Sequence, residues 1–273
     1  MKLQKKLLLL CALILSLTIN THVQAQITPS GKLYQQMGPA ERSAFVAEQA
    51  RRIGREMSGN DYEFTSDFVG DIQQAVNQYA RRIGKSRGDG PGKEEARLVF
   101  ERGQAQAPVL IAAFKSRNIS PLIGLYLPWI ESEYVNIESP NSMGAIGMFQ
   151  FLPQTGERFG LSTQDLLDVG KSADAAARYI SDSLEQFKDD PMKEALALLA
   201  YNRGGQRTAR DLKFLLNEQN KRCSICALTA DRSKLDETFR YENVFYVPRF
   251  FAAAIIGENP QAFGLQMQPL SSH

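Results

Sequence analysis

Three glutamates stand in the segment ESEYVNIESPNSMGAIGMFQFLPQTG, residues 131–156, which contains no other charged residue. Glu131 directly follows the apolar run LIGLYLPWI, which predicts a buried helix. Burial disfavours the carboxylate anion and raises the pKa of the carboxyl group, which suits a general acid near neutral pH. Helical geometry points Glu133 away from Glu131, so we expect Glu133→Gln to affect the reaction only mildly in comparison with Glu131→Gln. A paired structural glutamate is the alternative interpretation of Glu131.

The N-terminal residues are typical of an export signal. Three lysines precede an apolar run from Leu7 to about Leu17, and Val23 and Ala25 stand where a signal peptidase would cleave. The run is shorter than the roughly 20 residues that a membrane-spanning helix needs. We therefore predict a signal peptide over residues 1–25 and export to the periplasm or cell envelope, with an uncleaved N-terminal anchor as the alternative.

Loss of this segment limits the chemistry that the mature chain can perform. It removes three of the 32 basic residues and none of the 30 acidic ones, so the formal charge becomes −1, which disfavours nucleic acid as a partner. It also leaves His273 as the only histidine. A Ser-His-Asp triad, a Cys-His pair and a His-ligated zinc site are therefore disfavoured, and we predict neither a metal nor a cofactor.

Two cysteines remain in the mature chain, and they stand close together. Cys223 and Cys226 are expected to form a local disulfide, because an exported chain matures in an oxidising compartment. A redox-active pair is the alternative. The strand–helix pattern that usually surrounds such a pair is missing here.

Apolar residues recur at helical spacing along most of the chain, and strand signals are weak. We therefore predict a mainly α fold. The Gly-rich stretch GKSRGDGPGK, residues 84–93, is interpreted as a solvated linker. It closes an N-terminal helical region over residues 26–93 and precedes a compact helical catalytic domain over residues 94–262. The remaining residues, 263–273, are predicted to be a C-terminal tail.

Three motifs follow one another along residues 94–260. The first joins Glu131-Ser132 to GAIGMFQFLPQTG at 144–156, the second is AYNRGG at 200–205, and the third is ENVFYVP at 242–248. Together they resemble the lytic transglycosylases with an SLT-type catalytic domain of goose-type lysozyme-like fold. The sequence FGL at 159–161 is most similar to the membrane-bound D-type branch. The LysM-like repeats that usually bind the wall in that branch do not follow.

The resemblance implies a lysozyme-like helical fold and a single catalytic carboxyl group, with peptidoglycan glycan strands as the partner. Glu131 would protonate the oxygen that joins N-acetylmuramic acid to N-acetylglucosamine, and would then help the muramoyl C6 hydroxyl attack C1. The product is a 1,6-anhydro sugar, and the substrate supplies the nucleophile in place of a second carboxylate. A hydrolytic muramidase of the same fold and an inactive glycan-binding scaffold are the alternatives.

The resemblance also assigns supporting residues around the acid. Gln150 and Tyr201 match positions that line the sugar cleft, and Glu242 matches a glutamate that contacts the substrate. Tyr246 matches a tyrosine near the acid, and its hydroxyl is expected to hydrogen-bond Glu131. Core packing is the alternative for the two tyrosines.

Three further residues are expected to shape the loops of the site. The resemblance assigns Asn202 to fixing the loop behind the site, and Gly144 and Gly147 to a turn in which the backbone approaches closely. Asn141 stands where the family usually has a serine. Ser142 is therefore our choice for the residue that contacts the acetamido group of the substrate.

Overall fold

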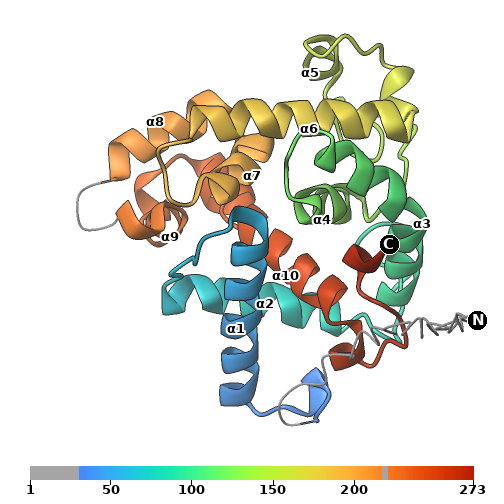
Figure 1. Cartoon of the computed structure of the whole chain (residues 1–273), viewed down its shortest axis with the longest axis vertical. Coiled ribbons are helices and arrows are strands. Elements are labelled where there is room, and N and C mark those ends of the chain that lie inside the picture. Colours follow the sequence, from blue (N-terminus) through green and yellow to red (C-terminus); the bar gives the residue numbers. More distant parts are fainter. Residues whose placement is uncertain (1–30, 217–220) are drawn as a thin grey trace, which may run out of the picture.

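The computed structural model describes residues 31–216 and 221–273, so the predicted signal peptide lies outside the described residues. Within them the chain is mainly helical, as predicted (Figure 1), which is consistent with a lysozyme-like helical domain. The only β-type pairing in these ranges is an isolated bridge between Ile146 and Phe151. No described helix is long and apolar enough to cross a membrane. The α-helices are α1 (Pro39–Ser58), α2 (Ser66–Ala80), α3 (Ala96–Lys115), α4 (Pro121–Ser132), α5 (Pro153–Glu157), α6 (Val169–Gln186), α7 (Lys193–Arg203), α8 (Gly205–Leu215), α9 (Ser224–Ala230) and α10 (Tyr246–Glu258).

Helix α4 packs in the core, and nine of its 12 residues are buried. Two glycines let its neighbours approach closely. A Cβ at Gly124 would lie 2.4 Å from the ring of Phe114 on α3, and one at Gly257 of α10 would lie 2.2 Å from the ring of Tyr126 on α4. The tight contacts with α3 and α10 therefore fix the axis of the helix that ends at the predicted acid.

The N-terminal helices share this core. Helix α2 packs along α10, and Phe64 just before α2 meets Phe251 of α10 edge-on at 5.0 Å. The hydroxyl of Tyr62 donates to the buried carboxylate of Glu194 on α7 at 2.7 Å. One continuous cluster of buried apolar side chains includes residues of α1, α2, α4 and α10. The predicted boundary near residue 93 is thus a loop at the surface of a shared core.

The Gly-rich segment 84–93 is a folded loop held on the end of α4. The backbone N–H of Gly92 donates to the Glu133 carboxylate at 2.9 Å, and that of Arg87 donates to the carbonyl of Lys93 at 2.8 Å. The carboxylate of Glu94 accepts from the N–H of Gly90. The segment is exposed to solvent over nearly all of its length, and its hydrogen bonds also join it to the catalytic half of the chain.

The predicted C-terminal tail also packs onto the core. Phe263, Leu265 and Leu270 are buried. The hydroxyl and the backbone N–H of Ser271 both donate to the buried carboxylate of Glu258 at the end of α10. Residues 263–273 are thus integrated into the helical domain, and apolar burial together with these hydrogen bonds is the physical reason.

Candidate active site

Glu131 lies in the last turn of α4, where the chain reverses sharply. Glu133 and Tyr134 both adopt left-handed backbone conformations, with φ of 51° and 60°. Their N–H groups donate back to the carbonyls of Trp129 and Pro128, which closes the helix. The hydroxyl of the buried Ser132 donates to the carbonyl of Met148 at 2.7 Å. The end of the helix is therefore fixed to the loop of the first motif.

The carboxyl group of Glu131 is desolvated and has no cation bound to it. Its Oε1 accepts a hydrogen bond from the hydroxyl of Tyr246, which is the contact expected from the sequence. It makes no ion pair with any other residue that the structure describes. Burial raises the pKa of Glu131 to about 7, although the Tyr246 hydroxyl and the nearby Arg249 guanidinium both lower it. A carboxyl group with this pKa keeps its proton to near neutral pH, as a general acid requires.

Glu133 has the opposite surroundings, only two residues away. Both terminal nitrogens of Arg82 donate to its carboxylate, one at 2.8 Å, and the Gly92 N–H donates as well. Both side chains of the ion pair are buried. Glu133 is therefore an anchor for the N-terminal loop, and its acceptor positions are already occupied.

Two adjoining hollows form a groove beside α2 and α10, which we call the α2–α10 groove. Gln78 of α2 and Arg249 of α10 line both hollows. The first, of about 560 Å³, contains Glu131 together with the Arg82–Glu133 pair and parts of the 84–93 loop. The second, of about 460 Å³, is lined by Asp71, Gln74, Ala75, Asn202, Tyr241, Glu242, Phe245 and Pro248. The N-terminal region thus supplies one wall of the groove that contains the predicted acid.

The second hollow brings two predicted site residues together. Glu242 is exposed on the π-helix η5 (Phe239–Asn243), where it can reach a ligand. Asn202, at the end of α7, accepts a hydrogen bond from the side chain of Asn243 at 2.6 Å. This bond joins the end of α7 to η5, in keeping with the role expected for Asn202.

The loop of the first motif is held by its own hydrogen bonds. Gly147 has φ of 77°, and a Cβ there would lie 2.4 Å from the carbonyl oxygen of Leu166, so no other residue fits without a shift. Gly144 also has positive φ, of 86°, but the space around it is open. The side chain of Gln150 donates to the carbonyl of Gly147 at 2.8 Å, while Ser142 is exposed at the turn. Neither Gln150 nor Ser142 is among the residues that line the α2–α10 groove.

Tyr201 joins this loop to the helices behind it. Its hydroxyl donates to the carbonyl of Phe149 at 2.9 Å, and its ring lies 5.1 Å from that of Tyr179. Burial raises the pKa of Tyr201, and the charge of Glu131 raises it further, which places the two groups near each other. The ring of Tyr201 thus packs in the core while its hydroxyl fixes the loop. Both contacts are made within the protein, and the expected contact with sugar stays a prediction.

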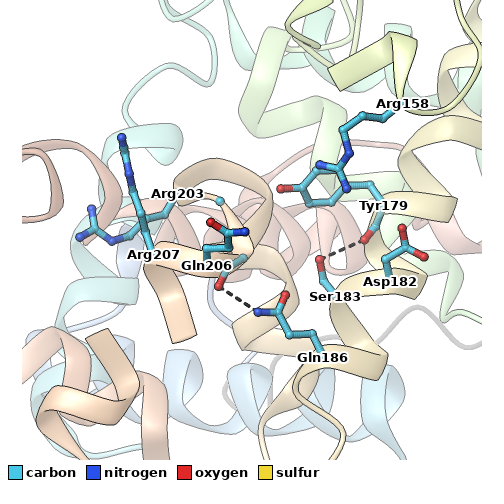
Figure 2. A pocket seen from close by; sticks show the side chains of 10 residues that line it. Arg158, Tyr179, Asp182, Ser183, Gln186, Arg203, Gln206 and Arg207 are labelled. Carbon is cyan, nitrogen blue, oxygen red and sulfur yellow. Dashed lines mark hydrogen bonds between the residues drawn. The ribbon is translucent and has the colours of Figure 1, made fainter. Parts of the chain in front are cut away.

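A third hollow, of about 490 Å³, lies between α6 and the start of α8 (Figure 2). Tyr179 of α6 lines it, and Gln186 donates to the carbonyl of Gly205 at 3.1 Å across its floor. Arg158 also reaches into it. Glu131 does not line this hollow, so the predicted chemistry belongs to the α2–α10 groove.

Sequence reasoning assigned no role to two arginines that organise the site. The buried Arg203 donates to Asp211 at 2.5 Å, to Asn243 at 2.9 Å and to Asp236 at 2.8 Å, which ties α7 to α8 and η5. Arg249 lines both hollows of the groove. The sequence does carry a signal for Arg249, which stands inside the otherwise apolar helix sequence YVPRFFAAAIIGE. An arginine in such a helix is rarely fully buried, so its side chain is expected to face a polar site or solvent.

The fold and site together define a helical lysozyme-like domain with one desolvated carboxyl group in a groove. Residues 108–222 match the family model of the transglycosylase SLT domain. The match supports an SLT-type lytic transglycosylase domain in this part of the chain, and peptidoglycan lytic transglycosylase activity in general. The matched residues include Glu131 and Tyr201 but end before Glu242 and Tyr246. The match does not distinguish the D-type branch. No curated protein matches the chain.

Proposed function

We propose that this protein cleaves the β-1,4 bond between N-acetylmuramic acid and N-acetylglucosamine in peptidoglycan and forms 1,6-anhydro-N-acetylmuramic acid. The observation that carries the proposal is the state of Glu131, which is desolvated, has a pKa near 7 and is hydrogen-bonded to Tyr246. It lies in a groove within an SLT-type domain. Cell-wall remodelling or turnover is the biological role that this reaction would serve.

One carboxyl group performs both steps of the proposed reaction. Glu131 donates its proton to the bridging oxygen as the C1–O bond breaks, and the resulting carboxylate accepts the proton of the muramoyl C6 hydroxyl as that oxygen bonds to C1. Proton transfer of this kind typically contributes about 10²–10⁴-fold to the rate. The muramoyl ring holds its own C6 hydroxyl close to C1, so an intramolecular attack replaces a bimolecular attack by water.

The other carboxylates of the groove support the single-carboxyl reaction. Glu133 is held by Arg82 and Gly92, so it cannot serve as a free base. Glu242 is exposed in the second hollow, where we assign it to the substrate. Asp71 lies 3.6 Å from Arg232 and is engaged by that cation.

The remaining assignments complete the proposal. Tyr246 orients the acid, and Gln150, Tyr201 and Ser142 are proposed to contact the sugars from the loop side, as the family resemblance implies. The resemblance to the D-type branch and export to the cell envelope belong to the same proposal.

Mass spectrometry of digested peptidoglycan in H₂¹⁸O tests the proposed reaction. We expect products that end in anhydro-muramic acid, which are lighter by one water than hydrolytic products and carry no ¹⁸O at the new end. Reducing ends that contain ¹⁸O would instead establish a muramidase. An unchanged wall after prolonged incubation would support a glycan-binding scaffold, with a known transglycosylase run alongside to show that the wall is digestible.

A further inference from the structure

The first hollow of the α2–α10 groove is rich in arginine. Four arginines line it, namely Arg81, Arg82, Arg87 and Arg249, against the two carboxyl groups of Glu131 and Glu133. Arg82 and Glu133 neutralise each other in a buried pair. Three positive charges therefore face a single carboxyl group, and that group keeps its proton until near neutral pH.

Arg81 and Arg87 are placed to meet a ligand. Arg81 follows the end of α2, and Arg87 lies in the 84–93 loop. Both side chains are exposed, and neither makes an ion pair with a residue that the structure describes. Asp89, the carboxylate nearest in sequence to both, is not among the residues that line the hollow. The loop itself is fixed through Gly92 and Glu133, so Arg87 is presented from an ordered backbone.

Arg249 provides the cation closest to the acid. Its guanidinium lies over the ring of Tyr246 at 5.9 Å and lowers the pKa of Glu131 by its charge. Its Nε is buried and has no hydrogen-bond partner among the described residues. A buried guanidinium donor without a partner is costly, and a ligand acceptor would remove that cost.

We propose that these three arginines bind a carboxylate on the substituent that muramic acid carries at C3. This inference rests on the proposed function, because it places the muramoyl unit at Glu131. In peptidoglycan that substituent is a lactyl ether, which ends either in its own carboxylate or in a peptide stem with carboxylates of its own. N-acetylglucosamine has no such group, so the basic hollow would select which sugar lies beside the acid. A guanidinium matches a carboxylate in geometry and charge.

The proposal explains why the N-terminal region packs against the catalytic half. Helix α2 and the 84–93 loop contribute Arg81 and Arg87, and the buried Arg82–Glu133 pair fixes both to the end of α4. In this arrangement the N-terminal region supplies two of the arginines that select the anionic substituent.

Three forms of one substrate separate the possible sources of the carboxylate. Glycan strands with intact stems, strands stripped by an amidase so that the lactyl carboxylate is free, and intact strands whose carboxylates are converted to methylamides are compared under single-turnover and steady-state conditions. We expect the wild-type protein to have a KM about tenfold lower for a charged form than for the methylamide form, and increasing salt to remove the difference. Preference for intact over stripped strands would identify the stem, and the reverse would identify the lactyl group.

Variants that remove positive charge test whether the preference for charged strands arises in this hollow. The double variant Arg81→Gln, Arg87→Gln should lose most of the KM difference between charged and methylamide strands, with kcat changed much less than KM. Arg51→Gln removes an exposed charge from α1 outside the groove and should retain the difference. Thermal unfolding of the variants checks that each is folded.

Two results would overturn the inference and leave the proposed function in place. One is a wild-type protein that forms anhydro products equally well from charged and methylamide strands. The other is a double variant that keeps the full preference. Absence of anhydro products from every wild-type digest would instead reject the proposed function itself.

Discussion

The surroundings of Glu131 and of Glu133 differ more than their spacing suggests. The two carboxyl groups leave the same end of α4, yet Glu133 accepts from Arg82 and from Gly92, whereas Glu131 accepts from the Tyr246 hydroxyl. Cations and N–H donors stabilise an anion, and burial with a single hydroxyl donor favours the protonated form. The same residue type is thus an ion-paired anchor on one side of the turn and a desolvated carboxyl group with a raised pKa on the other.

The left-handed turn at residues 133–134 makes this division possible. Residues two apart on a helix already point in different directions, and the reversal directs Glu133 toward the N-terminal loop, where it pairs with Arg82. A comparison of substitutions at these two positions therefore separates loss of chemistry from loss of structure.

The largest effect is expected from Glu131→Gln. The amide has nearly the same shape as the carboxyl group but cannot give up a proton, so the turnover of peptidoglycan should fall by about 10²–10⁴-fold or more. Glycan binding and folding should be largely retained, as measured by co-sedimentation with purified wall and by circular dichroism. A variant that keeps more than about a tenth of wild-type turnover would remove Glu131 from the mechanism.

The next effect concerns stability at Glu133. Loss of one partner from a buried ion pair costs about 3–5 kcal/mol, because the other charge stays buried without compensation. Glu133→Gln should therefore lower the free energy of unfolding in urea by an amount in or somewhat below this range. The mild effect expected from sequence concerned cleavage and not stability, and the sequence did not reveal the partner Arg82.

Two controls sharpen this test. Glu138→Gln changes an exposed glutamate in the same segment and should leave stability nearly unchanged. The double variant Glu133→Leu, Arg82→Met removes both charges and should recover part of the loss. Equal stability of Glu133→Gln and Glu138→Gln would show that the pair is not an anchor.

This contrast also shows what could be predicted from the sequence. The buried helix before Glu131 could be predicted from local apolar residues, and the family resemblance led us to expect the hydrogen bond from Tyr246, which lies 115 positions further along the chain. The Arg82–Glu133 pair joins positions 51 residues apart, through a turn with left-handed backbone at Glu133 and Tyr134 that no residue type there demands. Gly-rich composition likewise indicated that 84–93 is a loop but could not show where it docks. Tertiary contacts determine both the ion pair and the position of this loop, so the N-terminal wall of the groove could not be predicted from the sequence.

A third effect links the acid to stability. The pKa of Glu131 rises from an ordinary value of 4.5 to about 7 on folding, so between these pH values the folded protein binds more protons than the unfolded chain. The contribution of Glu131 to stability therefore decreases as pH rises through this window, by up to about 3 kcal/mol. Glu131→Gln removes the penalty. In urea unfolding, the free energies of unfolding of wild type and variant should change in parallel with pH below about 4.5. Above about 7 the variant should be relatively more stable. A constant difference between the two free energies at every pH would contradict the raised pKa.

A smaller effect is expected from Tyr246→Phe. The Tyr246 hydroxyl lowers the pKa of Glu131, so its loss should raise that pKa further. Wild-type activity should fall as pH rises above about 7, because the proton donor ionises, and the variant's descending limb should lie at higher pH. A hydrogen bond to a charged group is worth about 1.5–3 kcal/mol, so the maximum rate should fall by roughly tenfold or more as orientation is lost. A descending limb at unchanged pH would show that the hydroxyl does not tune the acid.

The smallest effect on stability is expected from the disulfide, which lies away from both glutamates. Cys223 and Cys226 are bonded, buried, and separated by three positions in the chain. Such a small ring constrains the unfolded chain less than a 15-residue loop, for which chain entropy gives roughly 3 kcal/mol. The Sγ of Cys226 accepts from the N–H of Thr65, whose side chain caps α2, so the bridge supports the helix that lines the groove.

The double Cys→Ser variant should melt within a few degrees of wild type but process glycan more slowly, since a looser α2 positions substrate less well. Thiol labelling of denatured, non-reduced protein checks that the bond is present. An unchanged rate together with a large drop in Tm would reverse the assignment, making the bridge a stabiliser and not a positioning element.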